Sequence, residues 1–204
     1  MFLLPLRSLN LVAVAAISSV LLFPQTAGHL ATTQGATDPQ TSLAKHSPHV
    51  TIGRIAPRAE DVSTVDGIIK AYYEVICGPA GQPRQWGRDA TLYIPNVRFI
   101  LVSEHAGGKV TAESMTHQEF VDDSEASLNG KAFYEREIHR VTQRAGNIVH
   151  IFSTSEHSSA PDGPVEGRSV DSLELFYDGT RWWIASVNIW EFGKNRPLPA
   201  EFLP

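Results

Sequence analysis

The chain has 204 residues, of which 42% are hydrophobic and 19% are charged, and its formal net charge is −5. These values are typical of a globular protein with one domain and a short additional segment, and they lack the clustered basic face typical of nucleic-acid binding. The single cysteine, Cys77, excludes an internal disulfide and CxxC motifs, and the sequence contains no P-loop, GxGxxG, HExxH, GxSxG or EF-hand motif.

Residues 1–28 have the order of features of a secretory signal peptide. Arg7 supplies a positive charge, an uncharged apolar run of about 15 residues follows at 9–23, and small residues come next. This run is shorter than the roughly 20 residues that a bilayer span needs. We therefore expect export to the periplasm or the medium after cleavage, with no other membrane contact; a retained N-terminal anchor is the alternative. Residues 29–60 are polar and interrupted by proline, which predicts a flexible leader.

The folded domain is predicted to span 61–194, with a C-terminal tail at 195–204. Its first element is an amphipathic helix that begins near Ser63 and ends at Gly78-Pro79. Apolar side chains recur along it with helical spacing, at Val65, Ile68, Ile69, Tyr72, Tyr73 and Ile76.

The middle of the chain predicts short elements. Residues 85–92 favour a helical turn that buries Trp86, residues 97–102 favour a strand, and residues 109–114 favour its return. Thr116 and Glu119 form a T-x-x-E capping box, which predicts a surface helix to about residue 128.

The last third of the chain predicts four strands, at 132–144, 147–158, 168–177 and 181–191. Helices followed by an antiparallel meander indicate an α+β domain. Asp178-Gly179 predicts a two-residue turn of type I′ between the last two strands.

That turn predicts which side chains share a face of the sheet. Asp171 would pair with Ser186, and Asn188 and Trp190 would lie on the same face. Both faces of this hairpin are largely apolar, so one is expected to pack on the helices and the other to form a homodimer.

Two stretches carry a resemblance to a known family, FYEREIHRVTQRAGNIVHIFSTSE at 133–156 and SVDSLELFYDGTRWWIASVNIW at 169–190. With the order of elements above, they resemble the nuclear transport factor 2-like superfamily, in its SnoaL-like branch. The resemblance covers roughly 61–191. It implies a cone-shaped fold, in which a curved antiparallel sheet wraps around N-terminal helices and leaves a pocket. Some members of the superfamily are enzymes, such as polyketide cyclases, ketosteroid isomerase and limonene epoxide hydrolase, whereas others only bind ligands or proteins.

An isomerase or cyclase of this shape needs a carboxylate in an apolar pocket. Asp171 is the candidate carboxylate by the register above, and His139, in the middle of its strand, is the candidate base for neutral pH. The alternative for both is a plain role in the sheet, as a partner of an arginine or across a strand pair. The candidate ligand-binding side chains, which could equally serve as core or sheet packing, are Tyr72, Trp86, Arg98, Asn188 and Trp190.

The connected arginine and aspartates of the superfamily's hydrolases do not transfer to this chain. Arg168 and Asp171 are three residues apart, which would point them to opposite faces of a strand. The histidines form no metal-binding set, so no metal and no cofactor are predicted. The sequence thus predicts an exported domain that binds a small apolar or amphipathic molecule. An isomerase, cyclase or hydratase that uses a pocket Asp or His is the alternative, and a dimerisation or assembly domain is the second.

Overall fold

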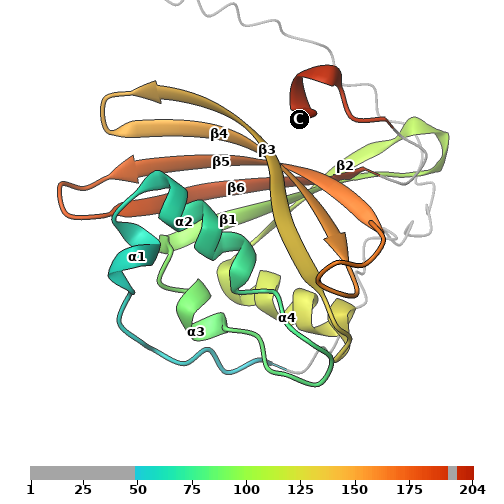
Figure 1. The fold of residues 1–204 in the computed structure, drawn as a ribbon, viewed down its shortest axis with the longest axis horizontal. Helices are drawn as coiled ribbons and strands as arrows, with labels where there is room; N and C mark the ends of the chain where they lie inside the picture. Colours follow the sequence, from blue (N-terminus) through green and yellow to red (C-terminus); the bar gives the residue numbers. More distant parts are fainter. Residues whose placement is uncertain (1–48, 193–196) are drawn as a thin grey trace, which may run out of the picture. The chain divides into compact units, whose positions relative to one another are not determined.

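The structure, a computed structural model, describes residues 49–192 and 197–204. The predicted signal peptide and most of the predicted leader lie outside these residues, so their prediction stands untested. In the described part, three helices come first, α4 lies between β2 and β3 in the chain, and the six strands form one sheet in the order β2-β1-β6-β5-β4-β3 (Figure 1). The expected α+β class, with a curved sheet around the N-terminal helices, is confirmed. None of the described helices is long and apolar enough to cross a membrane.

The predicted first helix corresponds to α2, and a further short helix, α1, precedes it. Helix α1 covers Ala59–Val62 and helix α2 covers Val65–Glu74. Ser63, the expected N-cap, instead ends α1, and the hydroxyl oxygen of Thr64 caps α2 by accepting a hydrogen bond from the Gly67 amide at 2.9 Å. The apolar stripe of α2 faces inward as predicted, with Ile68 and Ile69 fully buried.

The middle elements match the predictions closely. Thr116 and Glu119 form the predicted capping box at the start of α4, and Asn129 ends this helix in the left-handed conformation. The predicted turn around Trp86 is a short helix that buries this side chain. The elements are α3 (Trp86–Asp89), β1 (Tyr93–Glu104), the 3-10 turn η1 (Ala106–Gly108), β2 (Val110–Met115) and α4 (His117–Leu128).

The four predicted strands of the last third are present as an antiparallel meander. They are β3 (Tyr134–Ala145), β4 (Ile148–Ser158), β5 (Gly167–Tyr177) and β6 (Trp182–Phe192). The sheet is mixed rather than purely antiparallel, because β1 lies parallel to β6.

The turn between β5 and β6 has four residues, not the predicted two. Tyr177 pairs with Trp182, and the Asp178 carboxylate accepts hydrogen bonds from the backbone amides of Thr180 and Arg181 at 2.7 and 2.9 Å. The aspartate side chain thus satisfies the amides of a wider turn, as Asx turns do.

Two β-bulges then decide which side chains face inward. In β6, Glu174 pairs with Ser186 and Leu175 with Ile184, so Ala185 is the additional residue. In β3, the pairs shift between Glu137 and His139, which makes Ile138 the additional one. Because the side-chain period of a strand is two, each bulge moves the residues beyond it to the other face.

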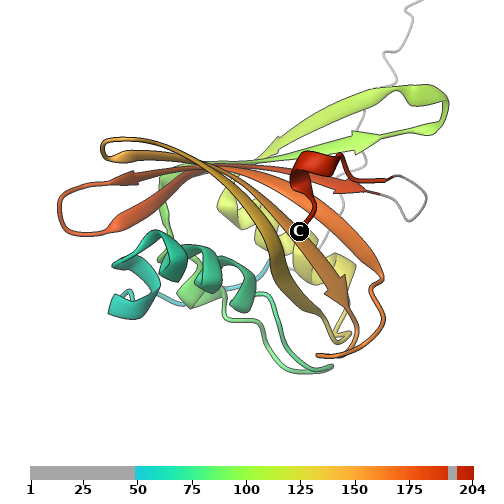
Figure 2. The same ribbon diagram turned by 45° about the horizontal axis from the view of Figure 1, so that its top comes forward.

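All four α-helices lie on one side of the sheet, which curves around them (Figure 2). The core forms there, where Ile68 and Ile69 of α2 belong to one buried cluster with Leu173 of β5 and Ile184 of β6. Full burial of side chains of this size contributes roughly 1.5–3 kcal/mol each, so the α2–sheet contact is a main source of stability.

The described ends of the chain pack on the domain. The Val50 amide donates a hydrogen bond to Asp122 of α4 at 2.7 Å. The 3-10 turn η2 (Ala200–Phe202) lies on the outer face of the sheet, where the Phe202 carbonyl accepts a hydrogen bond from Thr154 at 2.9 Å and the Phe202 ring contacts Phe152.

Candidate functional site

A cavity of about 260 Å³ lies between the inner face of the sheet and helices α2, α3 and α4. It is slightly smaller than the roughly 300–1,000 Å³ of pockets that hold drug-sized ligands, so its size suits a small organic molecule. Much of its wall is aromatic, through Tyr72, Trp86, Tyr93, Phe120 and Phe133.

Asp171 is the most buried carboxyl group of β5, with 3% of its surface exposed, and it lines this cavity. Its Oδ2 atom accepts a hydrogen bond from the Tyr72 hydroxyl at 3.0 Å, and its Oδ1 atom accepts one from Ser169 at 3.2 Å. Burial raises the pKa of Asp171 to about 7, although these two hydrogen bonds act in the opposite direction. The group therefore changes protonation near neutral pH.

Glu135 of β3 is a second carboxyl group on the same cavity. Its Oε1 atom accepts a hydrogen bond from the Ser155 hydroxyl at 2.6 Å. Burial raises the pKa of Glu135 to about 8, and the nearby charge of Asp171 acts in the same direction. The oxygens of Ser155 and Ser169 lie 2.8 Å apart, so a chain of two hydroxyl groups connects Glu135 to Asp171.

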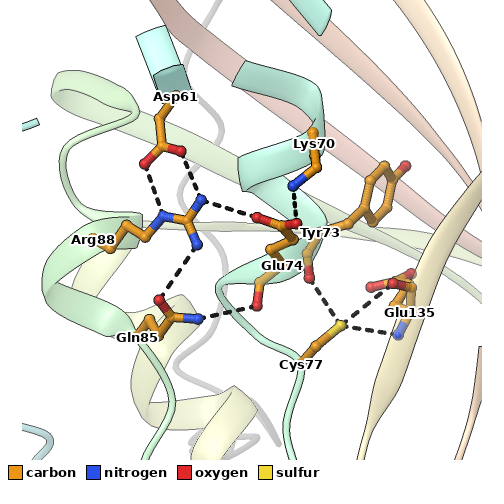
Figure 3. Close-up of polar contacts among 8 residues, drawn as sticks. All are labelled: Asp61, Lys70, Tyr73, Glu74, Cys77, Gln85, Arg88 and Glu135. Atoms are coloured by element: carbon orange, nitrogen blue, oxygen red, sulfur yellow. Dashed lines mark hydrogen bonds and ion pairs between the residues drawn. The ribbon is translucent and has the colours of Figure 1, made fainter. Parts of the chain in front are cut away.

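Two groups of polar contacts lie around α2, one of which reaches Glu135 of β3 (Figure 3). The Cys77 sulfur accepts a hydrogen bond from the Glu135 amide at 3.1 Å, and the thiol lies 3.0 Å from the Tyr73 carbonyl, which accepts from it. This places the start of β3 against the end of α2.

Arg88 joins the three N-terminal helices. It donates to both carboxylate oxygens of Asp61 in α1, at 2.7 and 2.6 Å, and to Glu74 of α2 at 3.0 Å. The Asp61 carboxylate holds the pKa of the Arg88 guanidinium above its usual value. Because Arg88 and Asp61 are both buried, this pair fixes the position of α3 and of the Trp86 ring.

A further polar cluster lies on the wall formed by α3 and β1. Asp89, which is 2% exposed, accepts a hydrogen bond from the Tyr93 hydroxyl at 2.9 Å and contacts Nε2 of His117 at 2.6 Å. Burial raises the pKa of Tyr93 well above its usual value, so this hydroxyl stays protonated.

The charge of the cavity has one sign. Five of the described residues that line it carry carboxyl groups, and none of them is lysine or arginine. The five are Asp89, Asp123, Glu135, Asp171 and Glu191. Such a wall disfavours anionic ligands and suits uncharged or cationic ones.

A second, more polar cavity of about 320 Å³ lies on the other side of Glu135. Glu135 and His157 line both cavities, and the second one also includes Arg136 and Asp162, which are exposed. Glu135 therefore stands between the aromatic cavity and a polar one that reaches the surface.

Three of the residues selected from the sequence line the aromatic cavity: Asp171, Tyr72 and Trp86. Tyr72, expected only as an apolar wall, also donates the hydrogen bond to Asp171. Their roles in binding or catalysis stay predictions, since placement alone does not establish them.

The expected position of His139 is wrong. The bulge at Ile138 pairs His139 with Thr154, which faces the outside and contacts η2. Glu135 and Glu137 stay on the inner face, where Glu137 accepts a hydrogen bond from Ser153. His139 therefore lies on the opposite face from the two glutamates with which it was grouped.

The expected positions of Asn188, Trp190 and Arg98 in the pocket are also wrong. The bulge at Ala185 pairs Asp171 with Ile189, so Asn188 and Trp190 lie on the outer face. Arg98 pairs with Ser186 of that same face and is exposed. Arg98, the cation expected in the pocket, therefore does not line the cavity.

Sequence reasoning missed Glu135, Ser155 and Ser169 as site residues. A signal was present, because Glu135 and Glu137 occupy alternate positions of one strand and a charged pair on an inward face needs an explanation. Ser155 and Ser169 gave no such signal, since the contact between them forms only when β4 pairs with β5. Among the described residues, no group of three or more His, Cys, Asp or Glu side chains is arranged to hold a metal ion.

No family model matches the chain, and no curated protein matches it. Solved structures similar to it include nuclear transport factor 2-like proteins, proposed ketosteroid isomerases and proteins with a cystatin-like fold. A proposed dehydratase of the nuclear transport factor 2-like family from Streptomyces avermitilis has 13% identity and a TM-score of 0.45, with 63% of this chain and 93% of that chain covered.

Two other structures have similar values. A proposed ketosteroid isomerase from Parabacteroides distasonis has 12% identity and a TM-score of 0.44, with 67% of this chain and 99% of that chain covered. A protein of unknown function from Mycobacterium tuberculosis has 12% identity and a TM-score of 0.47, with 63% of this chain and 69% of that chain covered. The likeness is one of fold, and the function of the site has to come from its own residues.

Proposed function

We propose that this protein is an acid–base enzyme of the isomerase type, which moves a proton on a small uncharged molecule bound in the aromatic cavity. The observation that carries the proposal is Asp171, a buried carboxyl group that lines the cavity, is hydrogen-bonded by Tyr72 and Ser169, and has its pKa raised to about 7. A general base with a pKa near the working pH is the most effective one.

The reaction follows from the chemistry of such a base. Asp171 in its ionised form removes a proton from a carbon next to a carbonyl group and returns it at another carbon, which moves the double bond. The developing oxygen charge needs hydrogen-bond donors, and the cavity wall includes the hydroxyl groups of Ser124 and Ser127 on α4. Simple binding without catalysis is less well supported, because a buried carboxyl group costs stability that a mere binding site has no need to bear.

The side chains that line the aromatic cavity indicate the class of substrate. Aromatic side chains favour a ring or an unsaturated chain, and the carboxyl groups disfavour carboxylates and phosphates. An uncharged unsaturated ketone with one or two rings is therefore the substrate class that we propose.

The test uses 3-cyclohexen-1-one and larger β,γ-unsaturated ketones, whose conversion to conjugated ketones is followed by ultraviolet absorbance. We expect the wild-type protein to accelerate at least one of these conversions and Asp171→Asn to reduce its rate by about 100-fold or more. Binding of 2-naphthol, a planar uncharged mimic of the dienol, is measured by calorimetry and should persist in this variant.

Glu113→Gln is the matched control, because Glu113 is an exposed carboxylate of β2 away from the cavity. It should leave both the rate and 2-naphthol binding unchanged. Should none of the ketones react faster with the wild type than with Asp171→Asn, the isomerase proposal is wrong. Binding of 2-naphthol without any turnover would instead support the non-catalytic binding module.

Export and dimerisation stay predictions. The outer face of the sheet, through which the dimer was expected, is partly covered by η2 of the same chain, so a partner subunit would have to pack beside it. Light scattering after size-exclusion chromatography of the mature chain tests the dimer, and N-terminal sequencing of the protein from the medium or periplasm tests the cleavage.

A further inference from the structure

Glu135, which is half-buried, and the buried Asp171 are joined through hydroxyl groups by more hydrogen-bonded pairs than these hydroxyl groups have hydrogens. There are four oxygen–oxygen contacts, from Glu135 to Ser155 at 2.6 Å, Ser155 to Ser169 at 2.8 Å, Ser169 to Asp171 at 3.2 Å and Tyr72 to Asp171 at 3.0 Å. Each contact needs one hydrogen between its oxygens, and each hydroxyl group has only one. The three hydroxyl groups supply three hydrogens, so the fourth must come from a carboxyl group.

From this count we infer that Glu135 and Asp171 share one proton, and that the hydroxyl groups of Ser155 and Ser169 form the path along which it passes. With the proton on Glu135, the bonds run from Glu135 through both serines to Asp171. With the proton on Asp171, both serine hydroxyls rotate and the bonds run the other way. All four contacts are satisfied in both arrangements, because Tyr72 donates to Oδ2 of Asp171 and Ser169 contacts Oδ1. The first arrangement is the resting state, since the hydrogen bonds from Tyr72 and Ser169 favour the ionised form of Asp171.

The surroundings of the pair agree with one shared proton. Burial acts on both carboxyl groups and raises both pKa values. Among the described residues, no lysine or arginine lines the aromatic cavity, whereas Arg136 lines the second cavity beside Glu135 and pairs there with Glu156 at 2.8 Å. The other titratable groups that face the pair are Tyr72, Tyr73 and Cys77 at α2, Tyr93 of β1, Glu137 of β3, His157 of β4 and Glu191 of β6, with Asp89 and Asp123 across the cavity. On the Asp171 side of the pair, a bound proton is thus the positive charge that is available.

This pathway can return Asp171 to its carboxylate form during catalysis, a role that rests on the proposed function. When Asp171 takes a proton from a bound substrate, Glu135 can release its own proton into the second cavity, which it also lines. The proton on Asp171 then passes through Ser169 and Ser155 to Glu135, and Asp171 becomes a carboxylate again. The reverse passage returns a proton from Glu135 to Asp171, which delivers it to the other carbon of the substrate, and Glu135 then takes up one proton from the second cavity. Each turnover thus breaks one C–H bond and forms one, and the protein ends in its resting state. Glu135 is then the residue that restores the base, and the two serines are positioning residues.

The test is a carbon-13 NMR titration of the Glu135 and Asp171 carboxyl groups in the ligand-free, full mature chain, with assignments from Glu135→Gln and Asp171→Asn. We expect the pair to hold one proton near neutral pH. Glu135 in Asp171→Asn should then titrate at a lower pKa than in the wild type, since the Asp171 charge that raises it is gone.

The serine path is tested by Ser169→Ala. Loss of the Ser169 hydroxyl removes the hydrogen bond between Ser155 and Ser169. This bond is present when the pair of carboxyl groups holds one proton and absent when it holds none. The pKa of the last deprotonation should therefore fall by roughly 0.5–1. Ser153→Ala is the matched control, because Ser153 belongs to the neighbouring contact with Tyr73 and Glu137 and not to this path. It should leave that pKa unchanged.

Three results would overturn the inference. They are two protons or none on the pair near neutral pH, an unchanged Glu135 pKa in Asp171→Asn, or the same pKa change in Ser169→Ala and Ser153→Ala. Because no substrate is used, a failure here is distinct from a failure of the ketone assay, which tests the proposed function alone.

Discussion

The burial of Asp171 predicts that the protein becomes less stable as the pH rises, and that Asp171→Asn removes much of this loss. The folded protein binds the proton of this carboxyl group more tightly than the unfolded chain does, because burial raises its pKa from 3.8 to about 7. Stability from this group is therefore fully present below about pH 4 and is lost as the pH rises towards about 7.

The size of the effect follows from the two pKa values. A carboxyl group whose pKa changes from 3.8 to about 7 on folding costs about 4 kcal/mol of stability once it is ionised in the folded state. Asparagine carries no charge at any of these pH values and has the same shape. We expect Asp171→Asn to match the wild type within about 1 kcal/mol near pH 4, and to be more stable by up to about 4 kcal/mol near pH 8.

The assay is urea unfolding of both proteins, followed by tryptophan fluorescence across this pH range. Groups that behave alike in both proteins cancel, so the difference between the free energies of unfolding reports the Asp171 charge together with the accompanying change in the Glu135 pKa. The exposed Glu113→Gln variant should keep the wild-type pH dependence. A difference between Asp171→Asn and the wild type that does not change with pH would refute the reasoning, because it would mean that burial does not penalise the Asp171 charge.

Three other variants test the contacts around the site. Tyr72→Phe removes a hydrogen bond that favours the ionised carboxylate, so NMR titration should give Asp171 a higher pKa than in the wild type. Arg88→Met leaves the buried Asp61 carboxylate without its partner and should lower the free energy of unfolding by about 3–5 kcal/mol, as measured in urea; a loss below about 1 kcal/mol would contradict a buried pair. Thr116→Ala removes the cap of α4 and should cost about 1 kcal/mol in the same assay, whereas Thr116→Ser should cost little.

Local patterns were reliable where the interactions that form an element lie within the element. The capping box at Thr116 and Glu119 uses only residues three apart, and it is present as predicted. The spacing of the apolar side chains from Val65 correctly identified the buried face of α2. The short helix α1 before Ser63 was not predicted, and the N-cap of α2 is Thr64 rather than the neighbouring Ser63.

The position of a side chain on one face of a strand was not reliable, because it depends on bulges. The wider turn at Asp178 alone would have kept Asn188 and Trp190 on the face of Asp171, since it adds two residues. The bulge at Ala185 adds one, and this odd number turns both side chains outward. No residue of the β6 sequence indicates the bulge, because it results from pairing with β5 on one side and β1 on the other.

The amino-acid sequence by itself determined the secondary structure, the α+β class, the apolar face of α2 and a short list of candidate residues that included Asp171. These features depend on spacing and on neighbours within about one helical turn or one strand. Only the tertiary structure decided which polar groups share the interior. Two β-bulges turned His139 and Asn188 outward and left Glu135 facing Asp171, with two serines between them, because long-range strand pairing sets the face of each residue.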